Sequence, residues 1–326
     1  RPHVMCLCTI APITSRKLKK HLEGGMTLGN VPTEEWFEKQ NHEDNIELIQ
    51  NKERETGLKL FHNEKGRALG LASIDIIKDH KWFIDGVHAE DKRAFLNDLH
   101  KVNGRYLFIL ARHTQNMQVD FYNEQGSYYD HVTNKVYCNI KDIMLGKINK
   151  KLDFKLNTSG FLHEAGHWLD SNIFKEPYGL SLKLDNLFRL IEYDVISYIN
   201  EIGYKYKNNF KPIRDLELKT ITSLDKELRE LITNSIRKNA EINSNISDLF
   251  GAMTHESIAG SVFNHLYGHK YDYWQREDRS VYYFKVKREA IAEMFESFSN
   301  IERIKAMQSF LPYSWAYFNK YINDIF

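Results

Sequence analysis

The chain has 326 residues, enough for one large or two ordinary domains with a core that needs no disulfide bonds. Hydrophobic residues make up 42%, charged residues 27% and aromatic residues 13%, a composition that excludes a disordered chain. The 45 Lys and Arg residues almost balance the 44 Asp and Glu residues, and a net charge of +1 excludes an overall field that would attract nucleic acid or an anionic membrane. We therefore expect neither as a partner.

Cysteine usage and targeting signals indicate the compartment. The chain has only three Cys residues, at positions 6, 8 and 138, and this small, odd number argues against a secreted scaffold held by disulfide bonds. We interpret Cys6 and Cys8 as buried thiols rather than metal ligands. The longest strongly apolar run, residues 106–111, is far shorter than the ~20 residues of a membrane span, and no signal peptide is recognisable. We expect a soluble protein, cytoplasmic or virion-associated rather than secreted. Because the sequence begins at Arg1 rather than Met, we expect a fragment or a processed product.

Two regions are predicted along the chain. Residues 1–84 are polar and are expected to form a partly helical lead-in, the end of an upstream domain, with a helix near residues 34–49. Residues 85–326 are predicted to form the main domain. That domain opens with a helix over residues 90–102, because Phe95, Leu96 and Leu99 share one helical face.

Strands are predicted next, and helices after them. Apolar and strand-forming residues predict strands at 106–111 and 119–122, and a hairpin with strands at 128–132 and 135–140 around Thr133-Asn134. Thr158 or Ser159 can cap a helix that runs to about Asp170. Further helices are expected at residues 182–202, 224–240, 247–265 and 287–299. Strands followed by helices predict an α+β fold.

The helix predicted before Asp170 contains an H-E-x-x-H motif, His163-Glu164-Ala-Gly-His167. Side chains four residues apart lie one turn above each other on a helix, so both imidazoles can bind one Zn²⁺ ion. Glu164 is placed to act as the general base on a water molecule that the metal activates. The motif thus predicts two metal ligands and a catalytic base.

A second interpretation of this helix stays open. The polar residues could form the solvent-exposed stripe of an ordinary amphipathic helix, with Leu162, Ala165 and Leu169 facing the core. Gly166 counts against it, because Gly inside a helix costs about 1 kcal/mol relative to Ala. We therefore predict that another part of the chain approaches the helix closely at Gly166.

A zinc site with two His ligands needs a third protein ligand, and the helix at 287–299 offers candidates. Glu289, Glu293 and Glu296 form an acidic stripe at positions i, i+4 and i+7. Taken alone, such a stripe is usually a solvated face. Beside the motif it predicts that one Glu binds the metal and that another, one turn away, accepts the outer N–H of a ligand His.

The pattern resembles the gluzincin group of zinc metallopeptidases, in which E-x-x-x-D/E follows H-E-x-x-H on a later helix. Glu289-Ala-Ile-Ala-Glu293 is similar to that signature. The resemblance implies a zincin-like domain with a small mixed sheet, with Glu289 as the third ligand and Glu293 as the residue that supports a ligand His.

A narrower resemblance is to the catalytic domain of anthrax lethal factor and the Pro-Pro endopeptidases. Their H-E-x-G-H-x-x-D pattern is matched through Asp170, which we expect to support the ligands with Glu293, and Tyr282 lies seven residues before Glu289. The family's matching Tyr assists the tetrahedral intermediate. The 121 residues between His167 and Glu289 exceed the family's spacing, so Tyr283 is an alternative.

Two other parts of the sequence carry candidate residues or a resemblance. His265 and His269 are four residues apart and are expected to be core or surface residues, with His269 as a further alternative donor to an oxyanion. Arg1-Pro-His-Val-Met-Cys6-Leu-Cys8 and Ser247-Asp-Leu-Phe250 resemble segments of phage minor head, or head-morphogenesis, proteins. That resemblance implies a virion protein with capsid or portal partners.

The sequence therefore predicts a zinc metalloendopeptidase that hydrolyses a peptide or protein substrate. Zn²⁺ is the expected cofactor, held by His163, His167 and Glu289. By fold analogy, residues 135–140 would form the edge strand along which a substrate pairs. The alternative is a phage head-associated structural or assembly protein in which a zincin fold keeps zinc mainly for stability.

Overall fold

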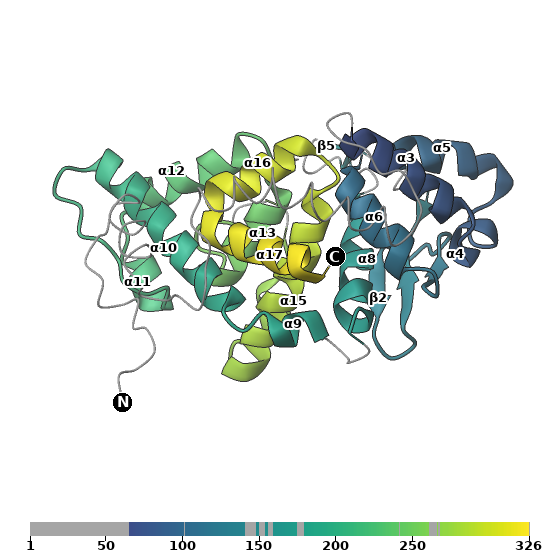
Figure 1. The fold of residues 1–326 in the computed structure, drawn as a ribbon. Coiled ribbons are helices and arrows are strands. Elements are labelled where there is room, and N and C mark those ends of the chain that lie inside the picture. Colours follow the sequence, from purple (N-terminus) through teal and green to yellow (C-terminus); the bar gives the residue numbers. More distant parts are fainter. Residues whose placement is uncertain are drawn as a thin grey trace. The chain divides into compact units, whose positions relative to one another are not determined.

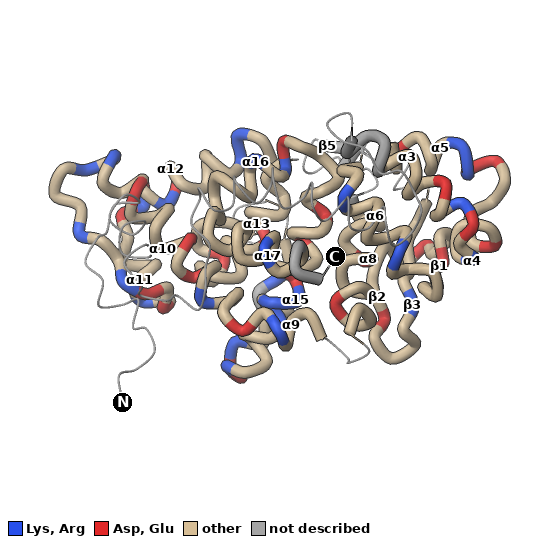
Figure 2. Tube along the Cα trace, viewed as in Figure 1, with Lys and Arg blue, Asp and Glu red and all other residues tan. Residues whose placement is uncertain are grey.

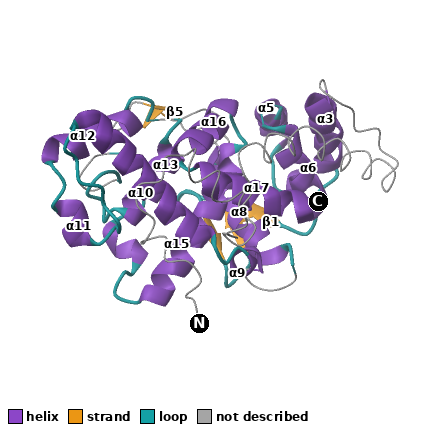
Figure 3. Ribbon diagram, turned by 60° about the vertical axis from the view of Figure 1, so that its left-hand side comes forward, coloured by secondary structure: helices purple, strands orange, loops and turns teal. Residues whose placement is uncertain are grey.

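The structure is a computed structural model. It describes residues 65–100, 102–140, 148–149, 154–155, 159–174, 179–240, 242–260, 266 and 268–325. The predicted helix near 34–49, Cys6, Cys8 and His265 lie outside these residues. Helices dominate the described chain and two small sheets accompany them (Figures 1 and 3), so the predicted α+β class is confirmed at this coarse level. Among the helices described, none combines the length and apolarity needed to cross a bilayer.

The chain divides into two compact units, each built from separated segments. The first contains Asp185–Val286 and Ala306–Asp324, and the second contains the described residues up to Leu184 together with Lys287–Lys305. Residues of both signs of charge occur in each unit (Figure 2). Residues 65–84, which the sequence analysis assigned to the lead-in, belong to the second unit.

The second unit holds the H-E-x-x-H helix and both sheets. Its elements are α3 (Lys65–Lys78), α4 (Lys81–Ile84), α5 (Ala89–Leu99), α6 (Gly104–His113), β1 (Gln118–Asp120), β2 (Tyr128–Asp130), β3 (Lys135–Tyr137), β4 (Ile148–Asn149), β5 (Phe154–Lys155), α8 (Ser159–Asn172) and α9 (Gly179–Lys183). The C-terminal part of α15 (Arg279–Ser297) and the start of α16 (Ile301–Phe310) complete it. The predicted helices at 90–102 and 159–170 are thereby confirmed as α5 and α8.

The larger sheet is mixed, with the order β1-β3-β2. β3 pairs in parallel with β1 and antiparallel with β2, and Val136 at its centre is fully buried. Asn134 between β2 and β3 has a positive φ of 53°, as a tight hairpin requires, so the predicted hairpin is confirmed. The prediction that 135–140 is an edge strand is wrong, because β3 is the middle strand. Among the described strands, β1 and β2 lie at the edges of this sheet.

The predicted strand at 106–111 is also wrong, because these residues lie in the helix α6. All of them are buried, and a helix that is covered on every side shows the same continuous apolar run as a buried strand. The side chain of Asn103 caps the helix by accepting a hydrogen bond from the backbone N–H of Arg105. α6 packs against α3, an element that the local sequence pattern cannot reveal.

An aromatic cluster fixes the position of α8 in its unit. Trp82, Phe95, Phe121 and Phe161 are buried, and their ring centroids lie 5.3–6.4 Å apart. These residues come from α4, α5, the segment after β1 and α8. Burying such rings supplies the largest apolar areas available to a core, so the cluster holds the motif helix against the N-terminal helices and the sheet.

The first unit is helical in its described part. Its elements are α10 (Leu187–Tyr206), α11 (Leu218–Thr222), α12 (Lys226–Arg237), α13 (Ser244–Met253), the short 3₁₀ helix η2 (Tyr271–Trp274), the start of α15, the end of α16, and α17 (Pro312–Ile325). The helix predicted at 224–240 is confirmed as α12. α13 ends earlier than predicted, where His255 and Glu256 adopt positive φ angles of 53° and 57°.

Two further boundaries differ from the prediction. The region predicted as one helix at 182–202 contains the end of α9 and, after a break, α10. α15 begins at Arg279, earlier than the predicted residue 287, so Tyr282 and Glu289 belong to one helix.

Candidate metal centre

Gly166 allows α15 to lie directly against the motif helix. A Cβ atom at Gly166 would lie 3.0 Å from Ala292 Cα and 3.2 Å from Phe295 Cβ. Both of these atoms belong to α15, so the predicted close approach is confirmed. The Gly therefore brings the acidic stripe of α15 toward the two motif histidines.

Tyr106 of α6 joins the same two helices from the side. Its hydroxyl donates to the carbonyl oxygen of Leu162 at 3.0 Å. Its ring lies 5.3 Å from that of Phe295 and is stacked on that of Phe298 at 5.8 Å. Through Tyr106, α6 thus holds α8 and the end of α15 together.

The polar residues of α8 do not face solvent. His163, Glu164 and His167 expose 5%, 8% and 7% of their surface, and Asp170 is fully buried. An amphipathic helix with a solvated polar stripe is therefore excluded. Burying such groups is costly unless they are paired or bind an ion, so their burial calls for a ligand or a network.

The acidic stripe of α15 is buried as well. Glu289, Glu293 and Glu296 expose 2%, 0% and 5% of their surface, so the alternative of a solvated acidic face is also wrong. Three carboxyl groups on one buried helical face repel each other when ionised, and this repulsion must be offset by positive charge.

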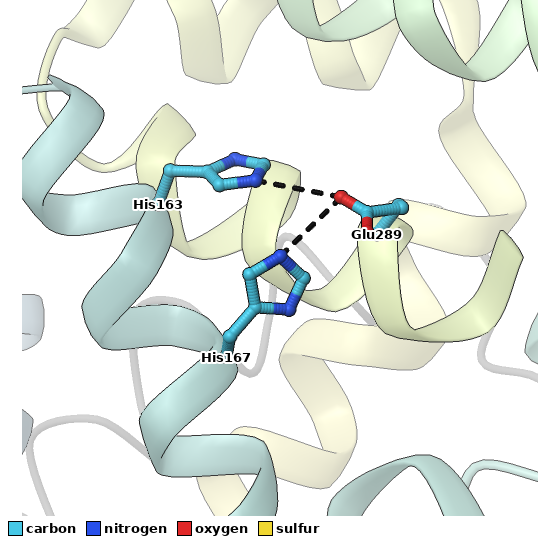
Figure 4. A group of neighbouring side chains, drawn as sticks. All are labelled: His163, His167 and Glu289. Atoms are coloured by element: carbon cyan, nitrogen blue, oxygen red, sulfur yellow. Dashed lines mark ion pairs between the residues drawn. The ribbon is translucent and has the colours of Figure 1, made fainter. Parts of the chain in front are cut away.

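Both motif histidines point toward one oxygen of Glu289 (Figure 4). Oε2 of Glu289 lies 3.4 Å from Nε2 of His163 and 3.3 Å from Nε2 of His167. The two imidazole rings are 4.9 Å apart and almost perpendicular, at 82°. The structure therefore brings together the three residues that the sequence analysis selected as ligands, and their donor atoms can hold one metal ion.

The spacing of these atoms fits a zinc ion. For bonds of about 2.0–2.1 Å, two donor atoms of a tetrahedral zinc site lie about 3.3–3.4 Å apart. The two distances to Glu289 Oε2 have this value. Two neutral imidazoles and a carboxylate are also a donor set that zinc accepts in sites with an open fourth position.

The other nitrogen of His163 faces Glu296 rather than Glu293. Nδ1 of His163 lies 3.2 Å from Oε2 of Glu296, within hydrogen-bond distance, and 3.8 Å from Oε2 of Glu293. The second oxygen of Glu296, Oε1, accepts a hydrogen bond of 2.9 Å from the guanidinium of Arg303, which is buried. The geometry gives Glu296 the contact that the resemblance implied for Glu293.

These charges shift the pKa values of the cluster. Burial lowers the pKa of His163, but the facing carboxylates of α15, Glu293 above all, outweigh it and hold the pKa well above the usual range. Burial raises the pKa of Glu296, but Arg303 and then His163 outweigh it and bring the pKa to about 2. The cluster therefore attracts positive charge strongly.

Glu164 lies on the side of α8 toward the sheet. Burial raises the pKa of the Cys138 thiol, and the nearby carboxylate of Glu164 raises it further. Cys138 directly follows β3, against which α8 packs. The buried Glu164 carboxylate is thus close enough to Cys138 to affect its titration.

Asp170 supports α9 instead of a motif histidine. Its two carboxylate oxygens accept hydrogen bonds of 2.6 Å from the backbone N–H and the hydroxyl of Ser181. Nδ1 of His167 is buried and has no hydrogen-bond partner among the described residues. Asp170 therefore ties the end of α8 to α9, and the hydrogen bonds described for it go to Ser181 rather than to a ligand histidine.

The candidate tyrosines belong to the first unit. The hydroxyl of Tyr282 donates to the carbonyl oxygen of Ala252 at 3.0 Å, and burial raises the pKa of Tyr282 to about 12. The ring of Tyr283 lies 4.0 Å from that of Phe188, and its hydroxyl accepts a hydrogen bond from Arg279. Both hydroxyls are therefore engaged within their own unit.

His269, also in the first unit, is held by Asp248. Its backbone N–H donates to Oδ1 of Asp248 at 2.6 Å, and its Nδ1 lies 3.0 Å from Oδ2. The imidazole is stacked on Tyr273 at 4.0 Å. A carboxylate at Nδ1 fixes the imidazole tautomer and leaves Nε2 as the atom that exchanges a proton.

Sequence reasoning missed two contributors to this centre. Glu296 was seen only as a member of the stripe, although its i+7 spacing from Glu289 places both on one helical face. Arg303 gave no local signal, because it lies on the next helix, α16, and reaches Glu296 only after the chain turns at residues 298–299.

Comparisons with protein-family models, with curated proteins and with solved structures return no match to this chain. Its function must be inferred from its own residues.

Proposed function

We propose that the chain is a zinc-dependent metallopeptidase of the gluzincin kind. The observation that carries the proposal is the convergence of His163, His167 and Glu289. The Nε2 atoms of the two histidines lie 3.4 and 3.3 Å from Glu289 Oε2, the spacing of neighbouring ligands in a tetrahedral zinc site, and all three donor atoms lie within 4.8 Å of one another. The charge of the cluster adds support. When ionised, Glu289, Glu293 and Glu296 carry three negative charges against the one positive charge of Arg303, and with His163 neutral as a ligand a divalent cation would balance the remaining two.

Each residue then has a role. His163, His167 and Glu289 would hold the metal, which would supply a Lewis acid and lower the pKa of a water molecule to about 7. Glu164 would take a proton from that water as its oxygen adds to the peptide carbonyl carbon. The same carboxyl would then give the proton to the leaving amine nitrogen as the C–N bond breaks. The hydroxyls of Tyr282 and Tyr283 and the Nδ1 of His269 are held by partners within the first unit, so none of these three residues is given a role in the proposed reaction.

The sheet offers a place for an extended substrate. β2 is an edge strand and α8 packs against it and against β3. An extended peptide can add to such an edge through backbone hydrogen bonds. We therefore propose β2 (Tyr128–Asp130), in place of the predicted 135–140, as the strand along which the substrate pairs.

One observation favours a second function. The three proposed ligands expose only 2–7% of their surface, as expected of a metal that stabilises a fold. A phage head-associated structural protein with zinc in that role is therefore the second candidate. Glu164 favours the peptidase, because a site that only stabilises a fold needs no general base.

Glu164→Gln separates the two functions. For a peptidase, we expect the variant to bind zinc as the parent does, measured by elemental analysis, and to lose cleavage of a peptide library by at least about 100-fold, the scale of general-base catalysis. The matched control is Glu192→Gln, a partly buried carboxyl of the first unit whose pKa is raised by burial. Zinc-loaded parent protein that cleaves no member of the library would support the structural function instead.

A further inference from the structure

His163 contacts Glu296 on the side of its ring that faces away from Glu289, and Glu296 in turn contacts Arg303. Neither Glu296 nor Arg303 belongs to the proposed ligand set. His163 contributes Nε2 to the convergence with Glu289, so its Nδ1 must carry the proton if the imidazole is to bind a metal while neutral. An acceptor at Nδ1 decides this tautomer. Two buried carboxylates of α15, Glu293 and Glu296, lie on that side.

Distance separates the two carboxylates. Oε2 of Glu296 is 3.2 Å from Nδ1 of His163, and Oε2 of Glu293 is 3.8 Å away, beyond hydrogen-bond distance. Glu296 is also the one joined to Arg303, whose guanidinium donates to Oε1 at 2.9 Å. The carboxylate of Glu296 is thus held at both oxygens, by α8 on one side and by α16 on the other.

We infer that Glu296 and Arg303 are positioning residues of the metal centre: Arg303 holds the carboxylate of Glu296, and Glu296 holds His163 as the Nδ1–H tautomer with Nε2 directed at the metal. This inference rests on the zinc site proposed above. It departs from the E-x-x-x-E resemblance, which gives this contact to Glu293.

A second metal ion is the competing interpretation of the same residues. Nδ1 of His163 and the carboxylates of Glu293 and Glu296 also lie close enough together to hold a cation. The guanidinium of Arg303 already places a positive charge 2.9 Å from Glu296 Oε1. Like charges in a buried site repel each other, so Arg303 favours the hydrogen-bond network, and we expect one metal equivalent per chain.

The decisive comparison is Glu296→Gln against Glu293→Gln, two equal changes one turn apart on a buried helical face. Affinity for Zn²⁺ is measured by competition with a chromophoric chelator. We expect Glu296→Gln to lose about 10–100-fold, the usual effect of removing a residue that orients a ligand, and Glu293→Gln to lose less than about threefold. An equal or larger loss in Glu293→Gln would overturn the assignment.

Arg303 is tested through its effect on Glu296. A Gln side chain at position 296 has one oxygen, for which His163 and Arg303 compete. We expect Arg303→Met to restore about threefold or more of the affinity lost in Glu296→Gln, because the oxygen is then free for His163. Losses that simply multiply in the double variant would show that Arg303 does not act through Glu296.

A readout independent of affinity completes the test. Ring ¹⁵N shifts of His163 in the zinc-loaded parent should show a protonated Nδ1 and a metal-bound Nε2, and thermal unfolding should show that each variant is folded. A metal-bound Nδ1, or two zinc equivalents per chain, would overturn the inference. Parent protein that binds no zinc would instead refute the proposed function, whereas zinc-binding parent with an unaffected Glu296→Gln variant would refute the inference alone.

Discussion

Gly166→Ala tests whether the approach of α15 to α8 builds the metal centre. The added methyl group would lie 3.0 Å from Ala292 Cα and 3.2 Å from Phe295 Cβ. Both are part of, or fixed to, the backbone of α15, so neither can turn aside as a flexible side chain could. The helices must therefore separate by a few tenths of an ångström.

Two effects of this substitution oppose each other. Replacing Gly by Ala within a helix stabilises it by about 1 kcal/mol. Overpacking a closely packed interface costs about 1–3 kcal/mol. The steric term is the larger one, so we expect the free energy of unfolding to fall by roughly 0–2 kcal/mol. The separation of α15 from α8 should also weaken zinc binding, because Glu289 moves with α15.

Gly160→Ala is the matched control on the same helix. The nearest atom that its Cβ would meet is Ser127 Oγ at 3.7 Å, an ordinary van der Waals contact. Urea unfolding and zinc affinity are measured for both variants. Gly160→Ala should unfold at the same or a higher urea concentration than the parent and bind zinc unchanged.

The reasoning would be refuted by a Gly166→Ala variant that behaves like Gly160→Ala. Increased stability together with unchanged zinc affinity would mean that α8 and α15 do not approach each other closely at this point.

Two further predictions concern stability. Asp194 accepts hydrogen bonds from the backbone N–H groups of Tyr313 and Ser314 at the start of α17, and burial raises its pKa to about 7. Between its ordinary pKa near 3.8 and about 7 the folded chain keeps a proton that the unfolded chain releases, so this contribution to stability is complete below the window and is lost as the pH rises through it. Urea unfolding should show a loss approaching about 1.4 kcal/mol per pH unit in the parent relative to Asp194→Asn, whereas parallel curves would refute the shift. Removal of metal by a chelator should lower the thermal midpoint, and added Zn²⁺ at 100 times its dissociation constant should restore about 2.7 kcal/mol; a midpoint that does not depend on zinc would contradict a metal bound to the folded state.

The sequence predicted the parts of the centre that depend on local spacing. The two histidines, four residues apart, share a helical face wherever the helix forms, and the i, i+4, i+7 stripe does the same for Glu289. The close approach at Gly166 could be predicted because Gly within a helix is less favourable than Ala, and this cost indicates a contact that leaves no room for a larger side chain. The hairpin at Thr133-Asn134 could be predicted because such a turn requires a positive φ angle, which Asn adopts more readily than most residues.

The parts that depend on distant partners could not be predicted in this way. Residues 106–111 are all apolar, so their sequence alone is compatible with a buried strand or a buried helix. The helices that pack around them, α3 among them, determine that they form a helix. β3 became the middle strand because β1 pairs with it in parallel, a non-local contact. Arg303 reaches Glu296 through tertiary packing between α15 and α16, which no residue spacing encodes.

The central claim is that His163, His167 and Glu289 bind one zinc ion. Crystals of the zinc-loaded protein measured on both sides of the zinc absorption edge test it most directly. The account predicts one anomalous difference peak, about 2.0–2.1 Å from Nε2 of both histidines and from a carboxylate oxygen of Glu289. Well-diffracting crystals with no peak between these three residues, or with zinc bound only elsewhere, would contradict it.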